Sequence, residues 1–394
     1  MSSSVLLHTA DWQLGKPFAS TRDEAKRHLL MQERIHAVQR LAETVKSTGA
    51  EFVLVAGDLF DSSQATKATV SAACQAIGLL GVPVFVIPGN HDHGGPGSVW
   101  EQDFFRREKE ELAPNLQLLL RPEPVVTPHA IIFPAPLLRR HEASDPTAWI
   151  RSALDDSSLP QDLPRIVFAH GTVQGFGSAA EMADDDELPG TANFIDLSRL
   201  PVDSVDYIAL GDWHGTRQVG PKAWYSGTPE IDRFPRGEGN RPGHVLKVTI
   251  SRGALPQVEE LRSGRFNWRE LAFRFADDAS LDLFSGQLDE MLGTRGGEHL
   301  LRLKLEGSLG IAAADRLEKI IEALEARLLR LKLDHRVSVA PTEEEAAALT
   351  RRAEDPLIAA VATQLGMQGM GDDEGAAVAR LALRELHAAL NAST

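Results

Sequence analysis

Seven side chains that can bind a divalent cation follow apolar runs in the first part of the chain. Each lies just past a run that is typical of a β-strand: Asp11, Gln13, Asp58, Asn90, His170, Asp212 and His214. Open α/β sheets carry their ligand sites at the carboxyl ends of strands. Oxygen and imidazole donors gathered at one sheet edge are what phosphoester hydrolysis with two metal ions requires. The set therefore predicts such a site.

The spacing within the motifs suggests how the side chains are presented. Asp11 and Gln13 are two residues apart, so in an extended chain both side chains would face the same way. A glycine precedes Asp58 and lets the chain turn sharply, which presents the carboxylate at the sheet edge. Asp61 is better placed to hydrogen-bond and orient a metal ligand than to bind the metal itself.

The seven side chains fall in five short motifs, one after each apolar run, and Pro88–Asp92 (PGNHD) is the most specific of these. His91 could hydrogen-bond a phosphoryl oxygen or protonate a leaving group. Asp92 could fix the tautomer of a nearby imidazole. A single strand-end Asp or Asn is more often a turn former, but five motifs with a complete ligand set favour a functional site.

Strands and helices alternate in the part of the chain that carries these residues. A helix is predicted over Arg22–Lys46, because apolar residues recur at three- and four-residue steps, and a second over Ala65–Leu80. Strands are predicted at eight apolar runs: Val5–Leu7, Phe52–Ala56, Val82–Ile87, Leu116–Leu120, Ala130–Phe133, Ile166–Ala169, Tyr207–Leu210 and Val245–Ile250. This alternation predicts an α/β fold with sheet structure covered on both faces.

The pattern changes near residue 260, which predicts two domains, 1–260 and 261–394. Beyond this point strands are predicted at Glu270–Phe275, Leu300–Leu305 and Arg336–Ala340. Leucines and isoleucines between Leu317 and Leu331 form one helical stripe. Further helices are predicted over Thr342–Arg352 and near Ala376–Leu390. We expect a small α+β domain.

The composition bounds the compartment and the partners. The single cysteine, Cys74, excludes a disulfide framework, and no apolar run reaches the length of a membrane span, so we expect a cytoplasmic protein. The net charge of −15 lacks the basic surplus of proteins that bind nucleic acid through bulk charge. If the substrate is DNA, local basic patches, metal ions or a partner must supply the attraction. The acidic stretch Ser178–Thr191 is predicted to be an exposed loop.

Together the motifs resemble those of the calcineurin-like metallophosphoesterase superfamily. Within it, LHTADWQLG, GDLFD, PGNHD, AHG and ALGDWHG, followed by Ser226-Gly227-Thr228-Pro229, are most similar to SbcD-type nucleases of DNA double-strand-break repair. The resemblance covers residues 5 to about 250. It implies a four-layer metallophosphoesterase β-sandwich flanked by helices, with a smaller α+β cap domain at the C-terminal end.

The resemblance also implies how two metal ions would share the ligands. Asp11, residue 13, Asp58 and His214 would hold one ion. Asp58, Asn90, His170 and residue 212 would hold the other, and His91 would be the catalytic imidazole. The family usually has histidine at both 13 and 212, where this chain has Gln13 and Asp212.

Both departures replace a nitrogen donor by an oxygen donor. Oxygen donors favour Mg²⁺ or Mn²⁺ over Zn²⁺, and we expect a site that prefers Mn²⁺, with Mg²⁺ as the alternative. Gln13 is a neutral and weaker ligand, so one position is expected to hold its ion less tightly than the other. The alternative is that Gln13 marks an impaired enzyme.

By resemblance, the chain is expected to be a divalent-metal-dependent DNA exo- or endonuclease in double-strand-break repair or in defence against foreign DNA. An SMC-like ATPase subunit is the expected partner, and a homodimer is a further alternative. Two other functions stay open: a small-molecule phosphatase or cyclic-nucleotide phosphodiesterase, and a non-catalytic DNA-end scaffold for the ATPase. A DNA substrate could stack on Trp12 and Trp213, which could equally pack behind the metal loops. Four arginines could contact phosphates or be scattered surface charges: Arg217, Arg233, Arg236 and Arg241.

Overall fold

The chain divides into two units, Met1–Phe266 and Asn267–Thr394. This computed structural model describes residues 3–174, 193–231, 240–293, 296–339, 342–351, 355–371 and 373–391. The division lies a few residues beyond the boundary predicted at 260, because β14 (Gln257–Arg262) still pairs with a strand of the first unit. The acidic stretch 178–191 lies outside the described residues.

One six-stranded sheet of the first unit carries the first three ligand loops. Its order is β14-β13-β1-β2-β3-β4, with bounds β1 Ser4–Thr9, β2 Phe52–Ala56, β3 Val84–Ile87, β4 Leu116–Leu118 and β13 His244–Ile250. Strands β1 to β4 run parallel, whereas β13 and β14 are antiparallel to their neighbours. The strand β3 begins after Pro83, later than predicted, and proline cannot donate to a strand ladder.

A second six-stranded sheet carries the remaining ligand loops. Its order is β11-β12-β10-β7-β6-β5, with bounds β5 Val125–Val126, β6 Ile131–Ala135, β7 Arg165–His170, β10 Tyr207–Gly211, β11 Arg217–Gln218 and β12 Ala223–Tyr225. A small parallel pair, β8 (Thr172–Val173) and β9 (Phe194–Ile195), follows β7. Both large sheets are mixed, and the predicted α/β class is confirmed.

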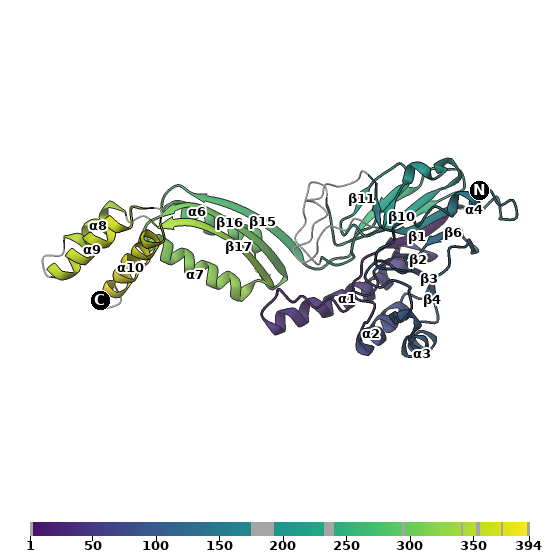
Figure 1. The fold of residues 1–394 in the computed structure, drawn as a ribbon, viewed down its shortest axis with the longest axis horizontal. Helices are drawn as coiled ribbons and strands as arrows, with labels where there is room; N and C mark the ends of the chain where they lie inside the picture. The colour runs from purple at the N-terminus through teal and green to yellow at the C-terminus, as the bar shows by residue number, and fades with distance from the viewer. Residues whose placement is uncertain are drawn as a thin grey trace. The chain divides into compact units, whose positions relative to one another are not determined.

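Three helices cover the outer face of the first sheet (Figure 1): α1 Glu24–Thr48, α2 Lys67–Gly78 and α3 Asp103–Leu112. The α1 helix begins where the Asp23 side chain accepts a hydrogen bond from the Lys26 amide. It ends at Gly49, which adopts the left-handed conformation. The second sheet is covered by the short α4 (Ile150–Leu154) and by 3-10 turns at Leu197–Arg199 and Val202–Ser204. A further 3-10 turn, Val99–Glu101, precedes α3.

The two sheets face each other across one apolar core. Side chains from both contribute to it, for example Leu6 and Leu54 from the first sheet and Ile166 and Phe168 from the second. Neighbouring residues of the same strands, such as Leu7 and Val53, point the other way and pack under α1 and α2. Burial on both strand faces explains why these strands read as continuous apolar runs. The layers of this unit are therefore helices, sheet, sheet and helix.

The second unit contains a parallel three-stranded sheet of order β15-β16-β17, with bounds Asn267–Phe275, His299–Leu309 and Arg330–Val339. Helices α6 (Ser280–Leu292) and α7 (Ile311–Arg327) pack on it. The C-terminal helices are α8 Glu343–Thr350, α9 Pro356–Gln368 and α10 Glu374–Asn391, and a 3-10 turn occupies Gly296–Glu298. Among the described residues, no helix combines the length and apolar character needed to cross a membrane.

The last strand of this unit begins earlier than the sequence predicted. We expected a strand at Arg336–Ala340 and a helix reaching Leu331. The helix instead ends at Arg327, and Leu331 and Leu333 pair with β16. The error has a physical reason, because leucines at 329, 331 and 333 also fit the two-residue period of a strand.

Candidate metal centre

The ligand candidates lie on loops that leave neighbouring strands of the two sheets. Asp11 and Gln13 follow β1, Asp58 follows β2 and Asn90 follows β3. His170 ends β7, and Asp212 and His214 follow β10. The sheets approach closely here, since a Cβ added to Gly211 would lie 1.8 Å from the Ala56 carbonyl oxygen. Loops far apart in the sequence therefore meet at one place.

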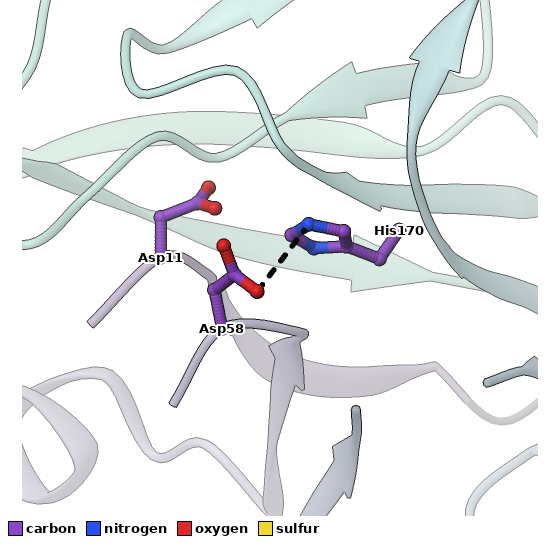
Figure 2. Close-up of side chains that lie close together, drawn as sticks. All are labelled: Asp11, Asp58 and His170. Atoms are coloured by element: carbon purple, nitrogen blue, oxygen red, sulfur yellow. Dashed lines mark ion pairs between the residues drawn. The ribbon is translucent and has the colours of Figure 1, made fainter. Parts of the chain in front are cut away.

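Asp11, Asp58 and His170 form the centre of the site. One possible ligand atom from each lies within 4.8 Å of the others, and all three side chains are buried. Figure 2 shows the two carboxylates turned toward the imidazole ring. His170 Nε2 lies 3.7 Å from Asp58 Oδ1, the ion pair that is dashed there.

Asn90 and Asp212 join this centre from two further loops. His170 Nε2 lies 3.0 Å from Asn90 Oδ1 and 3.7 Å from Asp212 Oδ1. The Asp212 amide donates to both carboxylate oxygens of Asp11, at 3.2 Å each. Thr172, which the sequence reading did not single out, donates its hydroxyl to Asp212 Oδ2 at 2.7 Å. Five candidate ligands therefore surround one point.

The His170 ring is held in one orientation. Its Nδ1 lies 2.7 Å from the Ala56 carbonyl oxygen, which can only accept, so Nδ1 carries the proton. The other ring nitrogen, Nε2, then faces the carboxylates as a metal ligand requires. Gly57 makes this contact possible, because a Cβ there would lie 2.2 Å from His170 Nδ1.

The electrostatics of the centre favour a bound cation. Burial raises the pKa of Asp11 to about 8, and the charges of Asp58 and Asp212 add to the rise. Burial also raises the pKa of Asp212. Burial by itself would lower the pKa of His170, but the carboxylates of Asp58, Asp11 and Asp212 raise it to about 9. Three carboxylates thus share a poorly solvated space with one imidazole, and a divalent cation would neutralise them. Their mainly oxygen donor set fits a divalent cation.

His91 lies beside this centre with one ring nitrogen turned toward it. Its Nδ1 donates to the Asp61 carbonyl oxygen at 2.9 Å, and its Nε2 lies 3.9 Å from Asp58 Oδ2. Its amide donates to Asp58 Oδ1 at 2.9 Å. Asp61 therefore orients His91 through its main chain. An unprotonated Nε2 beside the ligands can take up or return a proton during hydrolysis.

The structure corrects the role that we gave Asp92. Its carboxylate does not hold an imidazole: Oδ1 accepts from the Gly89 amide at 2.7 Å, and Oδ2 accepts from the Phe60 amide at 3.1 Å. Trp100 donates its indole N–H to the Asp92 carbonyl oxygen. Burial raises the pKa of Asp92 to about 7. Asp92 is thus a positioning residue that ties the loop after β3 to the loop after β2.

Gln13 and His214 form a pair of their own. Gln13 Nε2 lies 3.4 Å from His214 Nε2, and Gln13 Oε1 accepts from Lys16 Nζ at 2.9 Å. The expectation that Asp11 and Gln13 face the same way in an extended chain is wrong. Both residues have positive φ, 52° and 41°, so the chain coils here and the two side chains have different partners.

Backbone strain is concentrated at the candidate ligands. Among the described residues, the non-glycine positions with positive φ are Asp11, Gln13, Phe18, Asp58, Asn193 and Asp212. Four of these six are candidate metal ligands. Such strain persists only where surrounding contacts impose it, and it gathers at functional sites.

Arg34 supplies much of that support, and the sequence reading missed it. This buried side chain of α1 donates to the carbonyl oxygens of Trp12 (2.7 Å) and Asp11 (2.9 Å). It also donates to Thr228 Oγ1 at 3.2 Å. A sequence signal existed, because an arginine stands between Leu30 and Val38 on the apolar stripe of the helix.

Of the side chains that we considered for DNA contact, those within the described residues contact other parts of the protein. Trp12 is buried and donates to Thr9 Oγ1 at 2.9 Å, so it packs behind the loop. Trp213 is also buried, with the Arg217 guanidinium 5.9 Å from its ring centre. Arg241 pairs with Glu260 at 2.6 Å. Arg233 and Arg236 lie outside the described residues.

Comparison with known proteins identifies the family to which this site belongs. The model of the calcineurin-like phosphoesterase family matches residues 4–216, a range that contains all seven ligand candidates and His91. Among solved structures, the crystal structure of TT1561 of Thermus thermophilus is similar with a TM-score of 0.40 at 12% identity, covering 66% of this chain and 100% of that one. More than half of the chain matches the family model, and the protein belongs to the calcineurin-like phosphoesterase family of metal-dependent hydrolases.

Proposed function

We propose that this phosphoesterase is a DNA exo- or endonuclease that acts in double-strand-break repair or in defence against foreign DNA. The observation that carries the hydrolytic part is the convergence of Asp11, Asp58, Asn90, His170 and Asp212 beside His91 Nε2. The choice of DNA rests on the resemblance to SbcD-type nucleases.

The Ser226–Pro229 turn supports that choice. It is the motif that most resembles the nuclease branch, and it packs directly against the last ligand loop. The Thr228 amide donates to the His214 carbonyl oxygen at 2.9 Å, and a Cβ added to Gly227 would lie 2.7 Å from that oxygen. The sequence of the turn therefore bears on how His214 is placed.

The residues can divide the chemistry of hydrolysis among them. A divalent cation held by the carboxylates would activate water and offset the charge on phosphorus. His91, held at Nδ1 by Asp61, would hydrogen-bond a phosphoryl oxygen or protonate the leaving oxygen through Nε2 in its imidazolium form, after Nε2 has taken up a proton. The hard oxygen donors favour Mg²⁺ or Mn²⁺ over Zn²⁺, and the imidazole of His170 among them makes the softer Mn²⁺ our proposed metal, with Mg²⁺ as the alternative.

The acidic net charge of the chain supports a partner subunit that would supply the attraction for DNA. With a net charge of −15, the protein as a whole does not attract DNA. We propose an SMC-like ATPase in the cytoplasm as the partner. Exposed apolar side chains on α9 and α10 support a docking role for these helices: Leu357, Val361, Val378 and Leu381. Leu386 and Leu390 of α10 pack inward instead, so the docking role is proposed only for the exposed face of this helix.

The test is cleavage of end-labelled duplex and single-stranded DNA with Mn²⁺. We expect wild-type protein to cleave DNA and His91→Ala to be nearly inactive. His36→Ala is the matched control, because His36 is an exposed histidine on α1 that pairs with Glu33. Hydrolysis of bis-p-nitrophenyl phosphate with intact DNA would instead indicate a small-molecule phosphodiesterase. DNA binding without turnover in any metal, unchanged by His91→Ala, would indicate a scaffold.

A further inference from the structure

The two halves of the candidate metal centre are built differently. Around His170 and Asp58, oxygen donors from four loops converge. The other half, which the resemblance assigns to a second ion, offers Gln13 and His214 beyond the shared carboxylates. A third side chain, Lys16, reaches into this half and contacts Gln13.

The chemistry of Lys16 fixes the orientation of the Gln13 amide. An ammonium group has only donors, so the Gln13 atom 2.9 Å from Lys16 Nζ must be the oxygen. The amide NH₂ group then points at His214 Nε2, 3.4 Å away. His214 Nε2 accepts this hydrogen bond, so it is the unprotonated nitrogen of the ring.

This arrangement removes the donors that a second cation would need. The Gln13 NH₂ group has no lone pair for a metal, and its oxygen is engaged by Lys16. The His214 nitrogen that would bind the ion receives an amide hydrogen instead. Lys16 also brings a positive charge to a position where a divalent cation on the same oxygen would be repelled.

Lys16 lies close to the catalytic end of the site as well. The pKa of the Asp61 carboxyl is raised by burial, and the Lys16 ammonium is the strongest charge that opposes this rise. Asp61 is the residue whose carbonyl holds His91. The ammonium is therefore close enough to the Asp61 carboxyl to act on its charge, in the loop that holds His91.

We propose that this chain binds one divalent cation, held by Asp11, Asp58, Asn90, His170 and Asp212, and that the Lys16 ammonium supplies the positive charge in the half of the site that the resemblance assigns to a second cation. The two substitutions in the motifs are then connected. Asp212 strengthens the half that binds the metal, and Gln13 anchors the lysine in the other. This inference concerns the metal content and holds whichever phosphoester is the substrate.

The first experiment measures bound Mn²⁺ by equilibrium dialysis with metal analysis and records the electron paramagnetic resonance spectrum. We expect one Mn²⁺ per chain in the wild type, with a spectrum free of manganese–manganese coupling. The variant Gln13→His/Lys16→Ala restores an imidazole and removes the charge. It should bind a second Mn²⁺ at least about tenfold more tightly than the wild type does and show a coupled spectrum. Gln13→Ala/Lys16→Ala is the matched control and should remain at one.

Wild-type protein with two coupled Mn²⁺ ions, or with none, would overturn the proposal even if every variant fails to fold. The second experiment tests Lys16 with inorganic phosphate as the probe, titrated into the Mn²⁺-loaded protein. Lys16→Met should weaken phosphate binding about tenfold at unchanged metal content, whereas Lys16→Arg should retain most of it. Equal phosphate affinity in the wild type and Lys16→Met would refute the role given to the ammonium. DNA cleavage enters neither measurement, so failure of the nuclease proposal remains distinguishable.

Discussion

His8 should make the stability of the first unit depend on pH in the mildly acidic range. This buried residue of β1 bridges the two sheets: its Nε2 donates to the Leu210 carbonyl oxygen at 3.1 Å, and its Nδ1 accepts from the Tyr207 hydroxyl at 2.8 Å. Burial lowers the pKa of His8 from the ordinary 6.5 to about 3, and the Leu210 hydrogen bond only partly opposes this. The ring therefore stays neutral in the folded protein.

The magnitude follows from this difference in pKa. Between pH 6.5 and 3 the unfolded chain binds a proton at His8 that the folded chain does not, so stability falls as the pH is lowered. Each pH unit well inside this window costs about 1.4 kcal/mol, which amounts to about 2 kcal/mol between pH 7 and pH 5. This contribution is fully present above pH 6.5 and lost progressively toward pH 3.

The assay is urea denaturation of wild-type protein and His8→Gln at pH 7 and pH 5. Glutamine can donate to Leu210 and accept from Tyr207, but it does not titrate. The drop in unfolding free energy between the two pH values should be about 2 kcal/mol smaller in the variant, and other titrating groups cancel in the comparison. His129→Gln, at a half-buried histidine paired with Glu51, is the control. An equal drop in wild type and His8→Gln would refute the reasoning.

Four further predictions concern the site. His91→Ala should lower turnover about 10²- to 10⁴-fold with unchanged Mn²⁺ content, and loss of the metal would contradict a role in proton transfer. Arg34→Met should lower the unfolding free energy by about 3 kcal/mol and weaken Mn²⁺ binding about tenfold, because the buried carbonyl oxygens of Trp12 and Asp11 lose their donor. Equal Mn²⁺ affinity of variant and wild type in a calorimetric titration would show that Arg34 does not support the metal site. Across a panel of metals, activity should be higher with Mn²⁺ than with Zn²⁺, and highest activity with zinc would disprove the preference. Because Asp212 has a φ of 105°, the variant Asp212→Gly should have a higher unfolding free energy than Asp212→Ala, by about 1 kcal/mol. At the exposed helix residue Glu43, the alanine variant should instead be more stable than the glycine variant in the same denaturation assay.

The parts of the fold that could be predicted from the sequence are those marked by short runs of neighbouring residues. An apolar run such as Phe52–Ala56, buried on both faces, followed by glycine and a carboxylate, reads as a strand end without knowledge of its neighbours. Strands therefore could be predicted, and with them the α/β class. Where two periods fitted the same residues, as at Leu329–Leu333, the sequence could not decide, because pairing with β16 made the choice.

The contacts that determine the chemistry of the site join residues far apart in the sequence, so they could not be predicted from neighbouring residues. Gln13 and His214 are separated by 201 residues, and Arg34 contacts Thr228 across 194. Asp92 read as a partner for an imidazole because it follows one, yet its carboxylate accepts from the backbone of another loop. Residue type indicated which side chains could bind a metal, whereas partner identity depended on how two sheets face each other.

The strain at the ligands follows from the same arrangement of sheets. The loops after β1 and β2 run side by side beyond the sheet, since the amides of Asp11 and Gln13 donate to the carbonyl oxygens of Gly57 and Asp58 at 3.1 and 2.8 Å. Regular strands would point alternate side chains to opposite faces. Positive φ at Asp11 and Asp58 turns both carboxylates toward the loop of the opposing sheet that carries His170. The strain and the crowding of carboxylates both destabilise the fold when no cation is bound. A cation that binds only the folded protein would raise the unfolding free energy by about 2.7 kcal/mol when the free cation is at one hundred times its dissociation constant.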